Sequence, residues 1–378
     1  MATEREKLWS ACARGADVIK DGTWILHRGE RIDVWGNTAL HVASMYNNPH
    51  TIADIANESA ACCGEDEFIC RNFAGHIPIE LACERGCAAA VKALLLHTPC
   101  EYITAKCMRL ACDSGSEDCA KEIASFFDSS GQHNAVDYDK RTILHMACEA
   151  GMAETALMLV RGGAIASSID NRGEMPLTSV VVQFDRMPPS ASDLLIALVR
   201  GGTPLEYEYD RRSTILFISC ACSMGRATEL LLSLGANPNH RNENGCYPVH
   251  IACSQGNTRA VKSLIGAGAL LDVSNNAGDL PIHTACSAPH TNADMLSLLR
   301  RGGANFNVPN KRGMYPIHLA VRSFTDEDAF AYLVSECRST VQRADPAGNT
   351  PLQVARAIRK HFVSVLASAE APRDLEER

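Results

Sequence analysis

Five histidines share one position in a repeated phrase, and such residues can bind metals or act as pH switches. Each follows a leucine, isoleucine or valine near the start of the phrase: His41, His145, His250, His283 and His318. Because there is one ring per copy of the phrase, the rings are spread along the chain instead of gathered at one point. We therefore expect each ring to form hydrogen bonds between its turn, its helix start and the adjacent loop.

Cysteines are the second group of side chains with chemical potential. Six follow the alanine of the same phrase: Cys12, Cys83, Cys112, Cys148, Cys253 and Cys286. A small apolar residue fits this place, so we expect most of these thiols to be buried and no disulfides to form. Cys62, Cys63 and Cys70 form a separate group, but the sequence contains no C-x-x-C pair. This spacing argues against zinc, and we expect neither a metal nor a cofactor.

The sequence contains none of the common enzyme signatures. We find no G-x-S-x-G, no G-x-x-x-x-G-K-[ST] and no H-E-x-x-H. The run "GAGALL" from Gly266 resembles the start of a dinucleotide loop. It lacks the third glycine and follows a helix, so we interpret it as a turn. We therefore expect the protein not to be an enzyme.

Composition limits the compartment and the partners. The chain has 378 residues and a formal net charge of -8, which argues mildly against a nucleic-acid partner. Its first residues, "MATEREKLWS", do not resemble a secretory signal, and no stretch approaches 18 uncharged apolar residues. The 17 cysteines then fit a reducing compartment. We expect a cytoplasmic protein, with the nucleus as the alternative, and no membrane span.

The elements that position these residues come from an internal repeat. A glycine precedes most copies of the phrase: Gly36, Gly75, Gly173, Gly245, Gly278, Gly313 and Gly348. The last three intervals are 33, 35 and 35 residues, and about eleven such units nearly fill the chain. We expect one repeat domain over residues 1–370, followed by a charged tail at 371–378. Residues 1–33 and 346–370 are its expected capping units, with repeats over 34–345.

Each part of the phrase has a physical reason. The glycine permits a positive φ in a turn, the threonine caps a helix and the proline fits the first helical turn. We expect first helices to begin near Thr38, Pro78, Pro248, Pro281, Pro316 and Pro351. A second glycine ends the helix in a left-handed conformation. It occurs at Gly86, Gly115, Gly151 and Gly256.

The phrases "GNTALHVA" at Gly36, "GCYPVHIAC" at Gly245 and "GMYPIHLAV" at Gly313 resemble the ankyrin repeat. This resemblance implies an all-α solenoid of helix-turn-helix units with projecting loops or short β-hairpins, in which inner helices line a concave face. It also implies non-enzymatic binding of a protein partner, as a scaffold or adaptor.

Three units depart from the pattern. The unit near Met108 lacks the opening phrase, and "RMPPSAS" after Asp185 forms an inserted loop between two helices. The unit near Thr214 has two registers, because either Cys220 or Cys222 can occupy the usual cysteine position.

Aromatic and basic residues recur at the loop tips just before the glycines, and both types are enriched at protein interfaces. The candidate partner-binding residues are Trp35, Phe73, Tyr138, Arg172, Tyr207, Tyr209, Arg212, Arg241, Lys311 and Arg312. Together with Lys140, Arg141 and Arg211, the basic tips could attract an acidic segment of a partner. Alternatively, the nearby Asp137, Asp170, Asp210 and Glu243 neutralise them.

Several functions stay open at this stage. We favour a monomeric scaffold or adaptor that binds a protein partner through the loop tips and inner helices. The alternative is a regulatory inhibitor or assembly chaperone that holds a single enzyme or transcription factor. Binding of nucleic acid by the basic tips would appear as heparin retention that is lost at modest salt.

Overall fold

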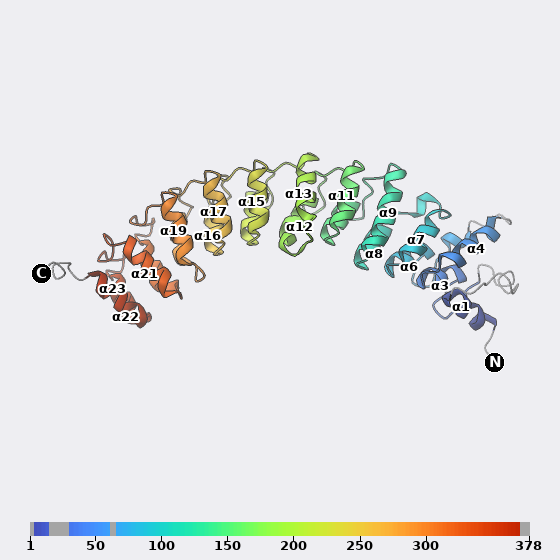
Figure 1. Ribbon diagram of the computed structural model, residues 1–378, viewed down its shortest axis with the longest axis horizontal. Helices are drawn as coiled ribbons and strands as arrows, with labels where there is room; N and C mark the ends of the chain where they lie inside the picture. Colours follow the sequence, from blue (N-terminus) through green and yellow to red (C-terminus); the bar gives the residue numbers. More distant parts are fainter. Residues whose placement is uncertain (1–3, 15–29, 61–65, 371–378) are drawn as a thin grey trace. The chain divides into compact units, whose positions relative to one another are not determined.

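The computed structural model describes residues 4–14, 30–60 and 66–370. The chain divides into two compact units, which are described separately. Unit 1 comprises Met1–Val180 and Met187–Thr203, and unit 2 comprises Val181–Arg186 and Pro204–Arg378. Both are built from short helices, and the fold is all-α (Figure 1).

Unit 1 is a stack of helix pairs. Its helices are α1 (Glu4–Arg14), α3 (Ala39–Met45), α4 (Pro49–Ala60), α5 (Asp66–Ile69), α6 (Pro78–Glu84), α7 (Ala88–Leu95), η1 (Cys100–Tyr102), α8 (Ala105–Asp113), α9 (Glu117–Ser129), α10 (Ile143–Glu149), α11 (Ala153–Arg161) and α13 (Ala191–Arg200). The first helices α3, α6, α8 and α10 pack side by side in one layer. The second helices α4, α7, α9, α11 and α13 form the other layer. The α12 helix (Pro176–Gln183) crosses the division at Val180.

Unit 2 repeats the same arrangement. Its helices are η2 (Phe184–Arg186), η3 (Asp210–Arg212), α14 (Ile215–Ala221), α15 (Gly225–Ser233), α16 (Pro248–Ser254), α17 (Thr258–Gly266), α18 (Pro281–Ser287), α19 (Ala293–Arg301), α20 (Pro316–Ser323), α21 (Glu327–Glu336), α22 (Pro351–Ile358), η4 (Lys360–Phe362) and α23 (Val363–Glu370). First helices α14, α16, α18, α20 and α22 pack in one layer. Second helices α15, α17, α19, α21 and α23 pack in the other.

The predicted first-helix starts are confirmed. Thr38 caps α3, and α6, α16, α18, α20 and α22 begin at the predicted prolines. The glycines predicted to end first helices have φ angles between +69° and +73°. The insertion is also present, since η2 and residues 187–190 separate α12 from α13. The number of repeats and the single-domain organisation stay predictions.

The structure corrects one expectation and decides a second one that was open. The short β-hairpins do not form: among the described residues the only β pairing is an isolated bridge between Val136 and Thr142, so the projections are loops. The register near Thr214 is resolved. Thr214 is the N-cap of α14 and Cys220 is buried, whereas Cys222 is the half-exposed C-cap. Cys220 therefore occupies the usual cysteine position.

The histidines connect neighbouring repeats. His41 Nδ1 accepts the Thr38 N–H at 3.2 Å, so the proton is on Nε2, which lies 2.9 Å from the His76 carbonyl of the next repeat. His145 and His250 make the same pair of bonds, to the carbonyls of Glu174 and Asp279. These bonds confirm the expected structural role.

The other two histidines form only one of the two bonds. Among the described residues, His283 Nδ1 accepts a backbone N–H while no group lies in hydrogen-bond geometry with its Nε2, and His318 Nε2 reaches the Arg343 carbonyl while its Nδ1 lacks such a group. Burial lowers the pKa of all five rings and lowers that of His250 to about 4.

The phrase cysteines lie in the packed layer between helices. All six are buried, with exposed fractions between 0% and 8%. Burial raises the pKa of the Cys12 and Cys112 thiols to about 12 and raises that of Cys148 and Cys253 further. Every cysteine among the described residues is a free thiol, and Cys100 is exposed.

We predict that thiol labelling separates these cysteines by burial. Native protein should react rapidly at Cys100 and slowly at the phrase cysteines, because a buried thiol with a raised pKa is rarely a thiolate. Urea-denatured protein should label close to 17 thiols. Mass spectrometry after a short pulse of iodoacetamide measures both. Rapid native labelling of Cys148 or Cys253 would contradict the prediction.

We predict that mild acid destabilises the protein through its histidines. The unfolded His250 ring titrates near pH 6.5 and the folded ring near pH 4. Between these values the unfolded chain binds more protons, so the free energy of unfolding falls as pH is lowered. For His250 alone the loss between pH 7.5 and 5.5 is about 1 kcal/mol.

Urea titrations at the two pH values measure this loss. The matched variant is His250→Gln, because Gln353 naturally accepts the Thr350 N–H at the equivalent position of α22. The variant should lose about 1 kcal/mol of the pH sensitivity. An unchanged pH dependence in the variant would show that His250 does not contribute.

Candidate protein-binding surface

Most loops that carry candidate residues are closed by an aspartate or asparagine three positions before the loop glycine, whereas the loop of Arg212 has Tyr209 at this position and no glycine. Asp33 Oδ1 accepts the N–H groups of Trp35 and Asn37 at 3.0 and 2.8 Å. Asn310 Oδ1 does the same for Arg312 and Met314 at 3.0 and 2.9 Å. The sequence analysis missed this device, although the spacing D/N-x-x-G is visible in the sequence.

One loop keeps its geometry without glycine. Lys140 stands where other loops have a glycine such as Gly173, and its φ is +59° against +78° there. A side chain in this left-handed region costs free energy. Asp137 supports the strained turn, because its Oδ1 accepts the N–H groups of Asp139 and Arg141 at 2.9 Å each. The hydrogen bonds of Asp137 therefore maintain the loop even though Lys140 has a disfavoured backbone conformation.

Neighbouring loops within each unit are joined by backbone hydrogen bonds. In unit 1, the Phe73 N–H donates to the Trp35 carbonyl at 3.0 Å, and the Asn171 N–H donates to Asp139 at 2.9 Å. In unit 2, Asn276 donates to Asn244 at 3.0 Å. Successive loop tips are thus held in register, which limits the entropy lost when a partner binds them.

The candidate aromatics of unit 1 are exposed on these tips. Trp35 is 63% exposed, Phe73 is 66% exposed and Tyr138 is fully exposed. The Arg31 guanidinium lies 4.5 Å from the centre of the Phe73 ring. Exposed large rings are unfavourable in water unless a partner covers them. These three side chains are therefore available for contact.

The two tyrosines of unit 2 differ from the aromatics of unit 1. The rings of Tyr207 and Tyr209 are half-buried and pack edge to face with their centres 4.8 Å apart. Part of their surface is therefore used within the fold, and they offer less area to a partner than Tyr138 does.

The basic tips are only partly neutralised. Arg212 pairs with Glu208 at 2.9 Å, Arg312 pairs with Asp279 at 3.2 Å, and Arg241 donates to Asn276 at 2.8 Å. Of the carboxylates expected to neutralise the tips, Asp137 pairs with Arg141 at 3.0 Å and Asp210 with Arg211 at 3.7 Å.

Two of the candidate cations differ from these. The side chains of Arg172 and Lys311 are exposed and form no ion pair with any residue that the structure describes. The loop tips therefore retain positive charge at these two positions.

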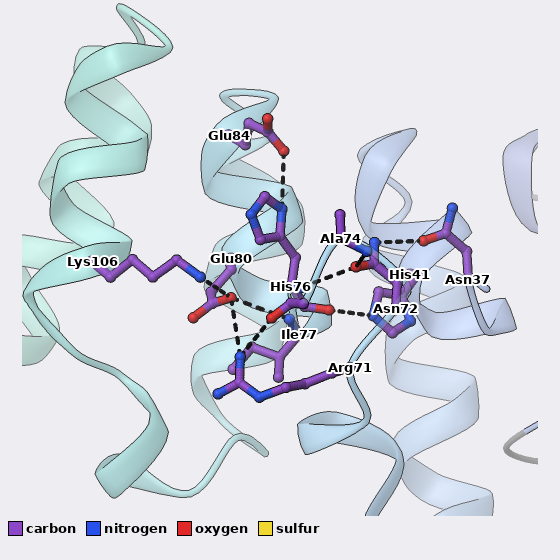
Figure 2. Close-up of polar contacts among 11 residues, drawn as sticks. Asn37, His41, Arg71, Asn72, Ala74, His76, Ile77, Glu80, Glu84 and Lys106 are labelled. Carbon is purple, nitrogen blue, oxygen red and sulfur yellow. Dashed lines mark hydrogen bonds and ion pairs between the residues drawn. The ribbon is translucent and has the colours of Figure 1, made fainter. Parts of the chain in front are cut away.

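A second polar group connects the first helices α6 and α8 of unit 1 to the loop that carries Phe73. Glu80 occupies the position that histidine holds in other repeats, and its side chain is only 4% exposed. Lys106 Nζ from α8 lies 2.7 Å from Glu80 Oε2, and Arg71 Nη1 lies 3.8 Å from it (Figure 2). The Ile77 N–H also donates to Glu80 at 3.3 Å. Sequence reasoning missed this cluster, although glutamate in "IPIELAC" was a visible departure.

The described residues show no metal centre. Within residues 4–14, 30–60 and 66–370, no group of three His, Cys, Asp or Glu side chains is arranged to hold an ion. Cys70 is half-buried, while Cys62 and Cys63 lie outside the described residues. In the same part of the chain, every helix is too short or too polar to span a bilayer.

Comparison with known proteins agrees with this architecture. Residues 216–307 match the family model of ankyrin repeats in three copies. The crystal structure of the human ASB11 ankyrin repeat domain superposes with a TM-score of 0.51 at 21% sequence identity, and the match covers 61% of this chain and 96% of that one. At this identity the superposition shows the fold alone. The family match shows that residues 216–307 are ankyrin repeats, and the helix pairs and closed loops of the rest of the described chain have the same kind of fold.

Proposed function

We propose that this protein is a scaffold or adaptor that binds a protein partner through the loop tips of its repeats. Ankyrin repeats are generally protein–protein interaction modules, and the family is generally non-enzymatic. The observation that carries the proposal is the group of exposed rings at Trp35, Phe73 and Tyr138 on loops of unit 1. Rigid aromatic side chains provide a large contact area at a low entropic cost.

The loop tips suit a partner that is at least partly acidic. Arg172 and Lys311 are exposed cations without an ion pair among the described residues. Such charges accelerate encounter with an acidic surface more than they add affinity. We further propose that the protein acts as a monomer in the cytoplasm or nucleus.

Affinity purification with cross-linking tests the proposal, because it identifies the partner and the contacting repeats together. We predict that replacing Trp35, Phe73 and Tyr138 by serine weakens partner binding by about tenfold or more, since large interface rings carry much of the binding free energy. The fold should persist, because these rings are exposed.

The matched control replaces Leu96 and Ile165 by serine. These two residues are 78% and 52% exposed but lie outside the candidate loop tips. The control should bind like wild type, and circular dichroism should show the same helix content in all variants. Equal binding by the aromatic variant and wild type would overturn the proposed interface.

We predict that replacing Arg172 and Lys311 by glutamate slows partner association by about threefold or more at low ionic strength, with little effect at high salt. Stopped-flow measurements across a salt series separate this effect from a change in dissociation rate. Arg161→Glu is the control, since Arg161 is an exposed cation at the end of α11, away from the loop tips. If the double variant associates as fast as wild type at low salt, these cations are only solvated surface.

A further inference from the structure

Two neighbouring pockets lie on the first helices of unit 1. The larger, of about 620 Å³, is lined by Arg71 and by residues of α6, η1, α8 and the loop that carries Tyr138. The smaller, of about 390 Å³, lies between α8 and α10 and includes Met146. Arg109 of α8 lines both. Because α6, α8 and α10 pack side by side, an extended segment that crosses them can place one side chain in each pocket.

The buried carboxylates of these pockets are already neutralised. Glu80 is held by Lys106 and Arg71 (Figure 2). The side chain of Asp137 is 7% exposed and pairs with Arg141 at 3.0 Å. A cation entering beside either carboxylate would compete with these pairs and lose its hydration at the same time.

Arg109 is in the opposite situation. It is half-buried, and its guanidinium forms no hydrogen bond or ion pair with any residue that the structure describes. The pockets also contain Glu101, Asp113 and Glu149; all three are exposed, and Glu149 pairs with Arg141 at 3.0 Å. An incoming carboxylate can therefore pair with Arg109 without breaking an existing contact. A guanidinium presents two parallel N–H donors to such a group.

Apolar surface lies next to this cation. In the larger pocket, Tyr102 is half-buried, Tyr138 is fully exposed and Val136 is 54% exposed. An apolar side chain beside the carboxylate would cover part of these residues, and burial of apolar area is favourable. The chemistry of the site thus combines one anion and one adjacent apolar group.

We propose that the Arg109 pockets bind an acidic peptide segment of the partner, with a glutamate or aspartate on Arg109 and an adjacent apolar side chain against Tyr102, Val136 and Tyr138. This proposal rests on the protein-binding function proposed above and names the chemistry of one contact within it. The cation of this site is separate from the basic loop tips, since Arg109 lies in the middle of α8, whereas Tyr138 belongs to both surfaces.

The test uses the full chain and three pools of short labelled peptides that carry a central Glu, Gln or Lys flanked by leucine or tyrosine. Fluorescence anisotropy should show that wild type binds the Glu pool about tenfold or more tightly than the Gln pool, as expected for a charged hydrogen bond. Arg109→Gln should abolish this preference and leave binding of the Gln pool unchanged. Arg109→Lys should retain part of it.

Arg85→Gln is the matched control, because Arg85 is an exposed arginine at the end of α6 outside both pockets. It should retain the full preference for the Glu pool. Thermal unfolding of each variant checks that the fold is intact. Should Arg109→Gln fail to fold, a reduced preference for the Glu pool in the folded Arg109→Lys variant supports the proposal, and an undiminished preference overturns it.

Three results would overturn the proposal: equal binding of the Glu and Gln pools, preference for the Lys pool, or no binding of any pool by wild type. Tyr138 is common to both surfaces, so the two proposals are separated by the binding of the purified partner to Arg109→Gln and to a loop-tip variant that replaces only Trp35 and Phe73 by serine. If only the loop-tip variant loses the partner, the Arg109 site is wrong while the proposed function stands. If neither loses it, both surfaces are wrong.

Discussion

Close packing between consecutive first helices is the interaction on which each unit depends. These helices have only seven to nine residues in α6, α8 and α10, and isolated helices of this length are unstable in water. They gain stability by packing on the next copy, through small residues such as Ala82, Cys83 and Cys148 that are completely buried. A larger side chain there would force the helices apart, at a cost of about 1–3 kcal/mol. The phrase cysteines thus serve the packing of these helices.

The histidines add hydrogen bonds between consecutive repeats to this packing. A ring such as His250 accepts an N–H from its own helix start and reaches a carbonyl of the following repeat. It therefore sets the distance between a helix start and the next loop. An Asp or Asn side chain then closes that loop, as Asp33 does for Trp35. The position of an exposed ring on the surface follows from this series of polar contacts.

The replacement of histidine by Glu80 changes the first-helix surface of unit 1. A buried carboxylate requires a cation, and Lys106 from the next helix supplies it at 2.7 Å. Lys106 is then occupied, as is Arg141 beside Asp137. Arg109, which lines the same pocket, lacks such a partner among the described residues. A departure from the repeat pattern and an unpaired charge thus occur in one pocket.

The helix starts, the left-handed glycines and the burial of the cysteines could all be predicted from the sequence. They depend on residues a few positions apart and on the repeat period, and both are visible in the chain. The residues that make up the candidate surface could also be proposed, since tips precede the glycines. Which of these side chains form ion pairs, and with which partners, could not be predicted. The partner of Arg312 is Asp279, 33 residues earlier, and the nearest carboxylates in sequence are not always the ones that pair.

The Arg109 pockets illustrate the same limit. They combine Arg71, residues of α6, η1, α8 and α10, and Tyr138 from the loop before α10. Nothing in the spacing of these residues indicates that they share a cavity, because their distances depend on how one repeat is stacked on the next. The repeat unit is a local property of the sequence. The pockets and ion pairs between repeats depend on the reach of individual side chains across the stack, and only the tertiary structure decides them.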